Sequence, residues 1–204
     1  DKEKRDKLEK YMEDMQKQGI DIVTIEDKEY PQLLKNIYDY PISLYCKGNK
    51  KILNRISFGI IGCREASSYG IKVARYFSYY LSQKGSNIVS GLAKGIDSHA
   101  HIGALQANGK TIGIIGSGLD VIYPKENQYL YDKIIKQNGA ILSEYPLGVE
   151  PIKMHFPARN RIISGISKGI IVVEAKKKSG TLITVDFALE QGRDVHVVPG
   201  NIDS

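Results

Sequence analysis

From about Ile56 onward, short apolar runs alternate with longer stretches in which apolar residues recur every three or four positions. The short runs predict buried strands, and the longer stretches predict helices with one face on the core. The predicted strands are 56–61, 87–89, 111–115, 140–142, 169–173 and 195–198, and the predicted helices are 69–84, 97–106, 127–136, 161–167 and 181–191. This alternation is typical of an α/β fold with a mainly parallel sheet covered by helices on both faces.

The residues before Ile56 show a different pattern. Residues 2–18 predict an amphipathic helix that ends at Gly19, with a stripe made by Leu8, Tyr11, Met12 and Met15. Alternation predicts a short strand at 20–25. A helix is expected to open at Tyr30-Pro31, and a second extended piece is expected at 44–46.

Two side-chain placements follow from these patterns. Within 69–84, we expect Val73, Phe77, Tyr80 and Leu81 to face the core, because they share one side of a helix. We also expect Asp97 to cap the helix that it begins, since a carboxylate accepts hydrogen bonds from free backbone amides.

Charge and composition narrow the class of protein. The 204 residues include 29 basic and 23 acidic ones, a net charge of +6 that leans mildly toward a polyanionic partner. Cys46 and Cys63 have no metal-binding or redox spacing and fit a reducing compartment. No apolar run reaches membrane-spanning length, and the charged first residues are unlike a signal peptide. We expect a cytoplasmic protein and, since the chain starts without Met, a fragment of a longer one.

The candidate binding chemistry gathers at the carboxyl ends of the predicted strands, where ligands collect in parallel sheets. These ends carry small or glycine-rich segments whose amides can receive phosphates, with Ser90 and Ser117 as hydroxyl donors to an anion. Segment 153–165 adds Lys153, Phe156 and Arg159, a combination that suits phosphates and an unstacked base. An ordinary solvated loop explains segment 153–165 equally well. The basic run 176–178 is interpreted as a solvated turn, with a phosphate contact as the alternative.

Cofactor and catalytic motifs are incomplete. Gly103 lies one residue too far from Gly109 for a P-loop, and no strand is followed by a complete dinucleotide fingerprint. His99 and His101 diverge on a helix and cannot easily share a metal ion. No nucleophile has a base and a carboxylate in a supported arrangement, and Asp97 and Glu144 are the strand-end carboxylates suited to proton transfer. We expect no catalytic residue, no metal and no cofactor.

Taken together, ordered segments from about residue 20 to the end resemble the DNA-processing protein A family (DprA/Smf). The matching segments are Tyr30-Pro31, 44–48, 62–64, 68–70, 90–97 with His101, 116–120, Tyr123-Pro124, 143–144, 156–161, 173–175, 179–181 and Pro199-Gly200. The resemblance implies an extended Rossmann-like fold at 20–204, truncated at its C-terminal end. Residues 1–19 would be the remnant of a small helical domain.

The resemblance also implies a function. Family members bind single-stranded DNA, protect incoming DNA and help load the recombinase RecA in natural transformation and DNA recombination, without acting as cofactor enzymes. Transferred by position, the DNA-binding residues are Arg64, Ser90, Gly91, Gly116, Ser117, Gly118, Lys125, Lys153, Phe156, Arg159 and Asn160. A homodimer is expected in the full-length protein through the C-terminal part, near Leu189. We expect no membrane partner.

Two departures and two alternatives accompany this resemblance. Cys63 stands where family members usually have Ser or Thr, and the chain stops before the family's closing segment. One alternative is a Rossmann-type nucleoside-monophosphate N-glycosidase, whose loop at 179–181 would need a glutamate at the position of Thr184. The other is a nucleotide-binding sensor that uses the same pocket.

Overall fold

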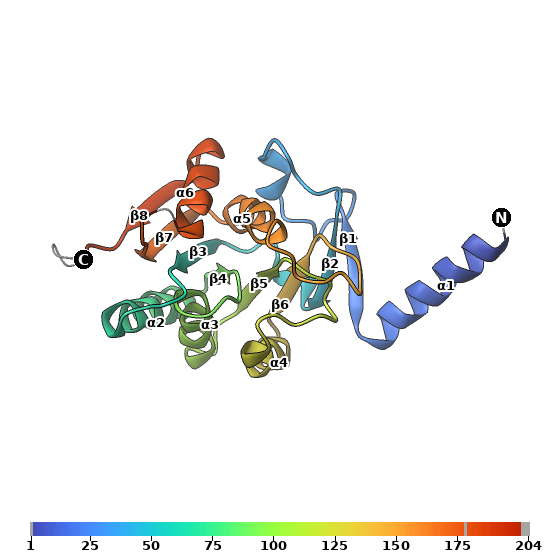
Figure 1. Ribbon diagram of the computed structural model, residues 1–204, viewed down its shortest axis with the longest axis horizontal. Helices are drawn as coiled ribbons and strands as arrows, with labels where there is room; N and C mark the ends of the chain where they lie inside the picture. Colours follow the sequence, from blue (N-terminus) through green and yellow to red (C-terminus); the bar gives the residue numbers. More distant parts are fainter. Residues whose placement is uncertain (1, 178, 201–204) are drawn as a thin grey trace.

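Eight strands form one sheet within residues 2–177 and 179–200, which the computed structural model describes (Figure 1). In chain order they are β1 (Ile20–Thr24), β2 (Ser43–Gly48), β3 (Ser57–Gly62), β4 (Asn87–Ser90), β5 (Thr111–Ile115), β6 (Ala140–Ser143), β7 (Gly169–Glu174) and β8 (Asp194–Val197). Their order across the sheet is β1-β2-β6-β5-β4-β3-β7-β8. The last residues of the predicted domain, 201–204, lie outside the described part.

The sheet is parallel from β6 to β8, and β1 and β2 are antiparallel additions at the other edge. From β3 the chain moves outward through β4, β5 and β6, and then it returns to place β7 on the other side of β3. In open α/β sheets, ligands bind where the strand order reverses in this way, because the loops there diverge. The mainly parallel α/β fold predicted from the sequence is confirmed.

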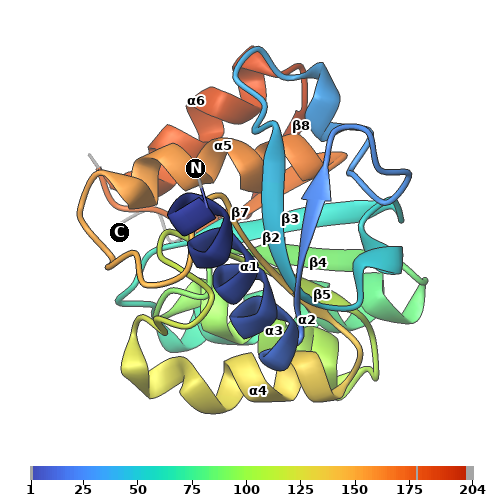
Figure 2. The same cartoon turned by 90° about the vertical axis from the view of Figure 1, so that its right-hand side faces the viewer.

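Helices cover both faces of this sheet (Figures 1 and 2). They are α1 (Lys2–Lys17), α2 (Ser68–Gln83), α3 (Ile96–Gln106), α4 (Gln128–Lys136), α5 (His155–Ile166) and α6 (Gly180–Glu190). On one face, Ala100 of α3 and Ile134 of α4 are fully buried in clusters with the strands. On the other face, Ile162 of α5 and Ala188 of α6 belong to the largest cluster. Burial of these apolar side chains is the main stabilising term of such a layered fold.

The orientation predicted for α2 is wrong in part. Phe77 and Tyr80 are 36% and 50% exposed, while small residues of α2 (Gly70, Ala74, Ser78 and Ser82) face inward. The reason is the close approach of α2 to α3, where a Cβ added at Gly103 would meet the backbone of Arg75. Helices that pack this closely need small side chains at the contact, and this pushes the aromatic residues outward.

Other local differences have identifiable causes. The helix expected at Tyr30-Pro31 is reduced to a single 3-10 turn at Leu34–Asn36, and the buried Tyr30 hydroxyl donates to the Pro41 carbonyl. Helix α5 begins at His155, earlier than predicted, because Pro157 falls in its first turn, where proline is tolerated. The cap of α3 is Gly95, and the buried Asp97 lies inside the first turn.

The N-terminal helix α1 projects from the body beside β1 (Figure 1). Met15 is buried, and the Tyr11 hydroxyl accepts a hydrogen bond from the Leu147 amide at 3.0 Å. Leu8 and Met12 of the predicted stripe are 60% and 41% exposed. Only the last turns of α1 are therefore packed against the sheet. Among the described helices, none combines the length and apolar character needed to cross a bilayer.

Candidate nucleic-acid interface

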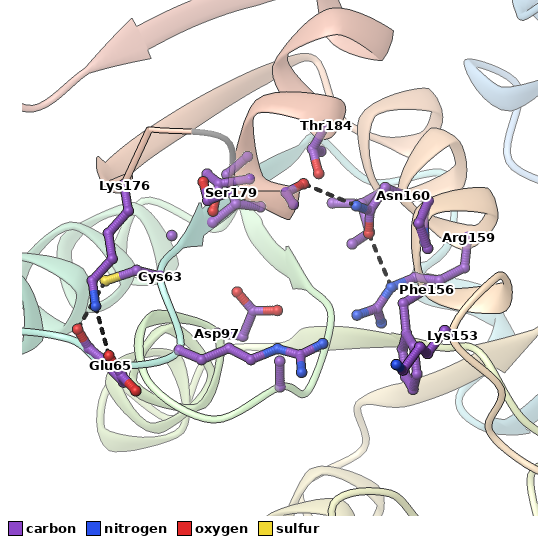
Figure 3. A pocket seen from close by; sticks show the side chains of 18 of the residues that line it. Cys63, Glu65, Asp97, Lys153, Phe156, Arg159, Asn160, Lys176, Ser179 and Thr184 are labelled. Atoms are coloured by element: carbon purple, nitrogen blue, oxygen red, sulfur yellow. Dashed lines mark hydrogen bonds and ion pairs between the residues drawn. The ribbon is translucent and has the colours of Figure 1, made fainter.

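A cavity of about 590 Å³ opens at the carboxyl ends of β3 and β7, where the strand order reverses (Figure 3). It is lined chiefly by residues from the end of β3, from the loops after β3 and β7, from α5 and from the first turns of α6. The lining comprises Ile61, Gly62, Cys63, Arg64, Glu65, Ala93, Asp97, Tyr123, Lys153, Phe156, Pro157, Arg159, Asn160, Ile163, Lys176, Ser179, Gly180, Thr181 and Thr184. The cavity has the volume of a typical small-ligand site.

One side of the cavity combines cations with aromatic rings. The Arg64 guanidinium carbon lies 5.6 Å from the Phe156 ring centroid, within reach of a cation–π contact. The Tyr123 ring is 5.5 Å from the Phe156 ring, at an interplanar angle of 42°. Arg64 and Lys153 are exposed. These side chains can place positive charge beside aromatic faces, which suits a flexible polyanion with accessible bases.

Arg159 does not offer a free cation, contrary to the expectation from sequence. It is 5% exposed, and its guanidinium donates to the Gly91 carbonyl at 2.6 Å and to the Ile114 carbonyl. Burial lowers the pKa of Arg159 to about 10, which leaves it protonated at neutral pH. Arg159 therefore ties the loop after β4 to the end of β5 beside the cavity.

Asp97 completes this buried arrangement (Figure 3). Its carboxylate accepts a hydrogen bond from the Gly91 amide at 3.1 Å, and the nearby Arg159 charge compensates it. Burial raises the pKa of Asp97, and Arg159 acts in the opposite direction. Glycine is required at position 91, because a Cβ there would meet both the guanidinium and the carboxylate. The carboxylate therefore fixes the loop and is already occupied by internal contacts.

Asn160 links the two helices that border the cavity. Its side-chain oxygen accepts from Arg159 Nε at 3.1 Å, and its amide nitrogen donates to the Gly180 carbonyl at 3.4 Å (Figure 3). Asn160 thus lies in the cavity wall, and part of its hydrogen-bonding capacity already joins α5 to α6.

The glycine-rich segment at 116–118, which follows β5, does not contribute to the cavity wall. Ser90 and Ser117 are buried, and their hydroxyls donate to the carbonyls of Ile60 and Val121. The Gly118 amide donates to the Val149 carbonyl at 2.8 Å, and Gly116 lies against His155. The hydroxyl donors expected for an anion are therefore used internally. Lys125 is exposed in a 3-10 turn and lies outside the described wall of the cavity.

Several wall residues were not predicted from the sequence. Tyr123 follows the glycine-rich loop after β5, and Thr181 and Thr184 come from the start of α6. Lys176 also lines the cavity, where it pairs with Glu65 at 2.6 Å. Lys178, part of the same predicted turn, lies outside the described residues. Of these residues, Lys176 lies just after a strand, and its basic run was assigned to a solvated turn.

The two strand-end carboxylates suited to proton transfer, Glu144 and Asp97, already accept hydrogen bonds within the protein. Glu144 receives two hydrogen bonds from Arg161, at 2.8 and 2.9 Å, and Arg161 is 9% exposed at its side chain. Asp97 is tied to the Gly91 amide. Where the alternative glycosidase would need a glutamate, the wall carries the buried Thr184.

Internal hydrogen bonds also engage Cys63, His99 and His101. The Cys63 thiol donates to the Glu65 carbonyl, and burial raises its pKa. His99 accepts from Arg75, and the buried His101 is hydrogen-bonded to Thr111 at 2.6 Å. Within residues 2–177 and 179–200, no cluster of three potential metal ligands occurs.

Comparisons with known proteins agree with this geometry. The family model for DNA recombination-mediator protein A matches residues 21–204. The chain is 46% identical over 197 residues to the DNA processing protein DprA of Bacillus subtilis, covering 96% of this chain and 66% of that protein. The chain therefore spans about two thirds of the length of this relative.

Two solved structures share the fold. The X-ray structure of DNA processing protein A from Streptococcus pneumoniae has a TM-score of 0.83 and 46% identity, covering 92% of this chain and 66% of that one. DNA processing protein A from Helicobacter pylori, described for its single-stranded DNA binding mode, has a TM-score of 0.82 and 34% identity, covering 90% of this chain and 83% of that one. With a family model that matches nearly the whole domain, the chain belongs to the DNA recombination-mediator protein A family.

Proposed function

We propose that this chain binds single-stranded DNA at the cavity between β3 and β7. The observation that carries the proposal is the grouping of Phe156, Arg64 and Lys153 at one wall of the cavity. Phosphates would pair with the two exposed cations, and a base would stack on Phe156. The single-stranded DNA binding described for the H. pylori relative supports this assignment.

Selectivity for single strands follows from the aromatic contact. A base can stack on Phe156 only if it leaves its neighbours, and in a duplex the bases are already paired and stacked. Duplex DNA would keep only the phosphate contacts, which carry no preference for single strands. Single strands should therefore bind more tightly than duplex of the same length.

The buried residues beneath the cavity would position it. Arg159 and Asp97 fix the loop at Gly91, and Asn160 fixes α6 to α5. We infer that these residues hold the shape of the binding wall, whereas Arg64, Lys153 and Phe156 contact DNA directly. Lys125 would add to the positive field near the strand ends without entering the cavity.

At the level of the whole protein, we propose a non-enzymatic role in the cytoplasm: protection of incoming single-stranded DNA and delivery of that DNA to RecA, in natural transformation and recombination. The names of the relatives as DNA processing proteins support this role. A homodimer through the C-terminal part remains a proposal, supported by the 61% exposure of Leu189 on α6. The occupied carboxylates and Thr184 support a binding role over glycosidic cleavage.

The test is the affinity of a labelled single-stranded oligonucleotide for Phe156→Leu and for Phe77→Leu. Both rings are partly exposed, but Phe77 lies on α2 away from the cavity, so it is the matched control. Loss of one stacked base should weaken binding roughly 5- to 150-fold for Phe156→Leu, and Phe77→Leu should bind like the parent. Equal affinities for both variants would refute the assignment of the cavity.

A further inference from the structure

A second, smaller hollow adjoins the cavity and shares the Arg64 and Phe156 side chains with it. It has a volume of about 50 Å³ and is lined by Arg64, Gly91, Ala93, Lys94, Tyr123, Pro124, Phe156 and Arg159. Five of these residues (Arg64, Ala93, Tyr123, Phe156 and Arg159) also line the larger cavity. A strand bound in the larger cavity can therefore extend past Phe156 into this hollow.

Tyr123 presents an aromatic surface between the two hollows. The side chain is 46% exposed, and its ring centroid lies 5.5 Å from that of Phe156. Because the two rings are inclined by 42°, one base cannot lie flat on both. Two consecutive bases could each take one ring, which is how single-strand binding proteins use adjacent aromatic side chains.

The hollow also has a cation at its edge. Lys94 is 56% exposed at its side chain and pairs with Glu126 at 2.7 Å. An exposed ion pair of this kind contributes little to stability, so Lys94 can exchange Glu126 for a phosphate at small cost. The hollow has room for only a few water-sized groups, so a base would lie across its mouth, against Tyr123.

We propose that this hollow is a second nucleotide subsite, with the base stacked on Tyr123 and the adjoining phosphate on Lys94. The inference rests on the proposed single-stranded DNA binding and adds a minimum footprint of two adjacent nucleotides. It assigns Tyr123 the same kind of contact that Phe156 makes at the first subsite. Because the hollow is too small to admit a whole nucleotide, the second base would stay at its mouth and remain partly exposed.

The test compares three 5′-phosphorylated dinucleotides as competitors of a labelled single strand: one with both bases, and two with an abasic unit at either the 5′ or the 3′ position. For the parent, the dinucleotide with both bases should compete roughly 5- to 150-fold better than the better of the two abasic dinucleotides, because each base then adds a stacking contact. Tyr123→Leu should abolish this gain, and Tyr123→Phe should keep it. Tyr129→Leu is the matched control, because Tyr129 is 56% exposed on α4 and lies outside both hollows.

The outcomes separate the two proposals. The subsite is refuted if the gain from the second base persists in Tyr123→Leu, or if the parent shows no such gain. This holds even if the single strand still binds through Phe156. If the parent does not bind the labelled strand, or binds it independently of Phe156, the proposed function itself is wrong. Lys94→Gln gives an independent check: it should weaken the dinucleotide with both bases and leave a mononucleotide unchanged, and the reverse pattern counts against the subsite.

Discussion

The contrast between Arg159 and Arg64 gives the sharpest prediction. Both were expected from the sequence to contact DNA, yet Arg159 is 5% exposed and bound to buried carbonyls, while Arg64 is exposed. Replacing Arg159 with Met removes the donors to Gly91 and Ile114 and leaves the Asp97 carboxylate buried without its cation. Removing one partner of a buried charge pair costs about 3–5 kcal/mol, so Arg159→Met should destabilise the fold by that amount.

The matched variant is Arg64→Met. A substitution of an exposed side chain away from buried contacts usually changes stability by no more than about 0.5 kcal/mol. We expect Arg64→Met to keep the parent's free energy of unfolding and to lose affinity for the oligonucleotide. Its binding should also depend less steeply on salt, with a log–log slope reduced by roughly 0.7 for one lost phosphate contact.

The assay is urea denaturation followed by far-ultraviolet circular dichroism, since the chain contains no Trp to report by fluorescence. The pH dependence adds a second signature for Arg159→Met. Without Arg159 the folded-state pKa of Asp97 should rise further, so the contribution of Asp97 to the stability of the variant is fully present below its unfolded pKa of about 3.9 and is lost as pH rises through the folded pKa. Parent-like stability of Arg159→Met, combined with weak DNA binding, would refute the buried role and restore Arg159 as a DNA ligand.

Three further predictions concern other buried contacts. Burial lowers the pKa of His101 to about 3, so the contribution of His101 to stability is present above about pH 6.5 and is lost as pH falls toward 3. In His101→Leu the free energy of unfolding should therefore depend less on pH in this range, by up to about 1.4 kcal/mol per pH unit. Unfolding measured at several pH values checks this. Glu144→Gln should cost about 1.5–3 kcal/mol in urea unfolding, because the charge-assisted bonds from Arg161 are weakened, and an unchanged midpoint would contradict this. Gly91→Ala should lower both stability and oligonucleotide affinity, because its Cβ would meet Arg159 and Asp97, and a variant that binds and melts like the parent would show that the loop is not held as described.

Much of the fold could be predicted from the sequence because most strands are continuous apolar runs. Thr111–Ile115 was predicted at its observed bounds, and the other strands of the parallel region differ from their predicted bounds by one residue at one or both ends. The orientation of α2 could not be predicted, because apolar periodicity favoured Phe77 and Tyr80 over the small residues that face α3. That choice depends on how closely two helices approach, which is a tertiary property.

The site was predicted in part for a related reason. Position after a strand indicated the correct edge of the sheet, and Arg64, Lys153 and Phe156 all line the cavity. Sequence alone could not separate an exposed cation from a buried one, so Arg159 was grouped with them. Nor could it show that the loop at Gly116 is covered by His155. Tyr123 was part of a recognised segment, but its proximity to Phe156 depends on how the loops after β5 and β6 fold together.

The measurement that tests the central claim most directly is fluorescence anisotropy of a labelled single-stranded oligonucleotide titrated with the parent chain, with unlabelled single strand, duplex and nucleoside monophosphate as competitors. The account predicts salt-sensitive binding that the single strand displaces, that duplex displaces much less, and that the monophosphate displaces only weakly. Equal displacement by duplex would contradict the stacking of a base on Phe156. Tight binding or turnover of the monophosphate, without binding of the strand, would contradict the DNA-binding role altogether.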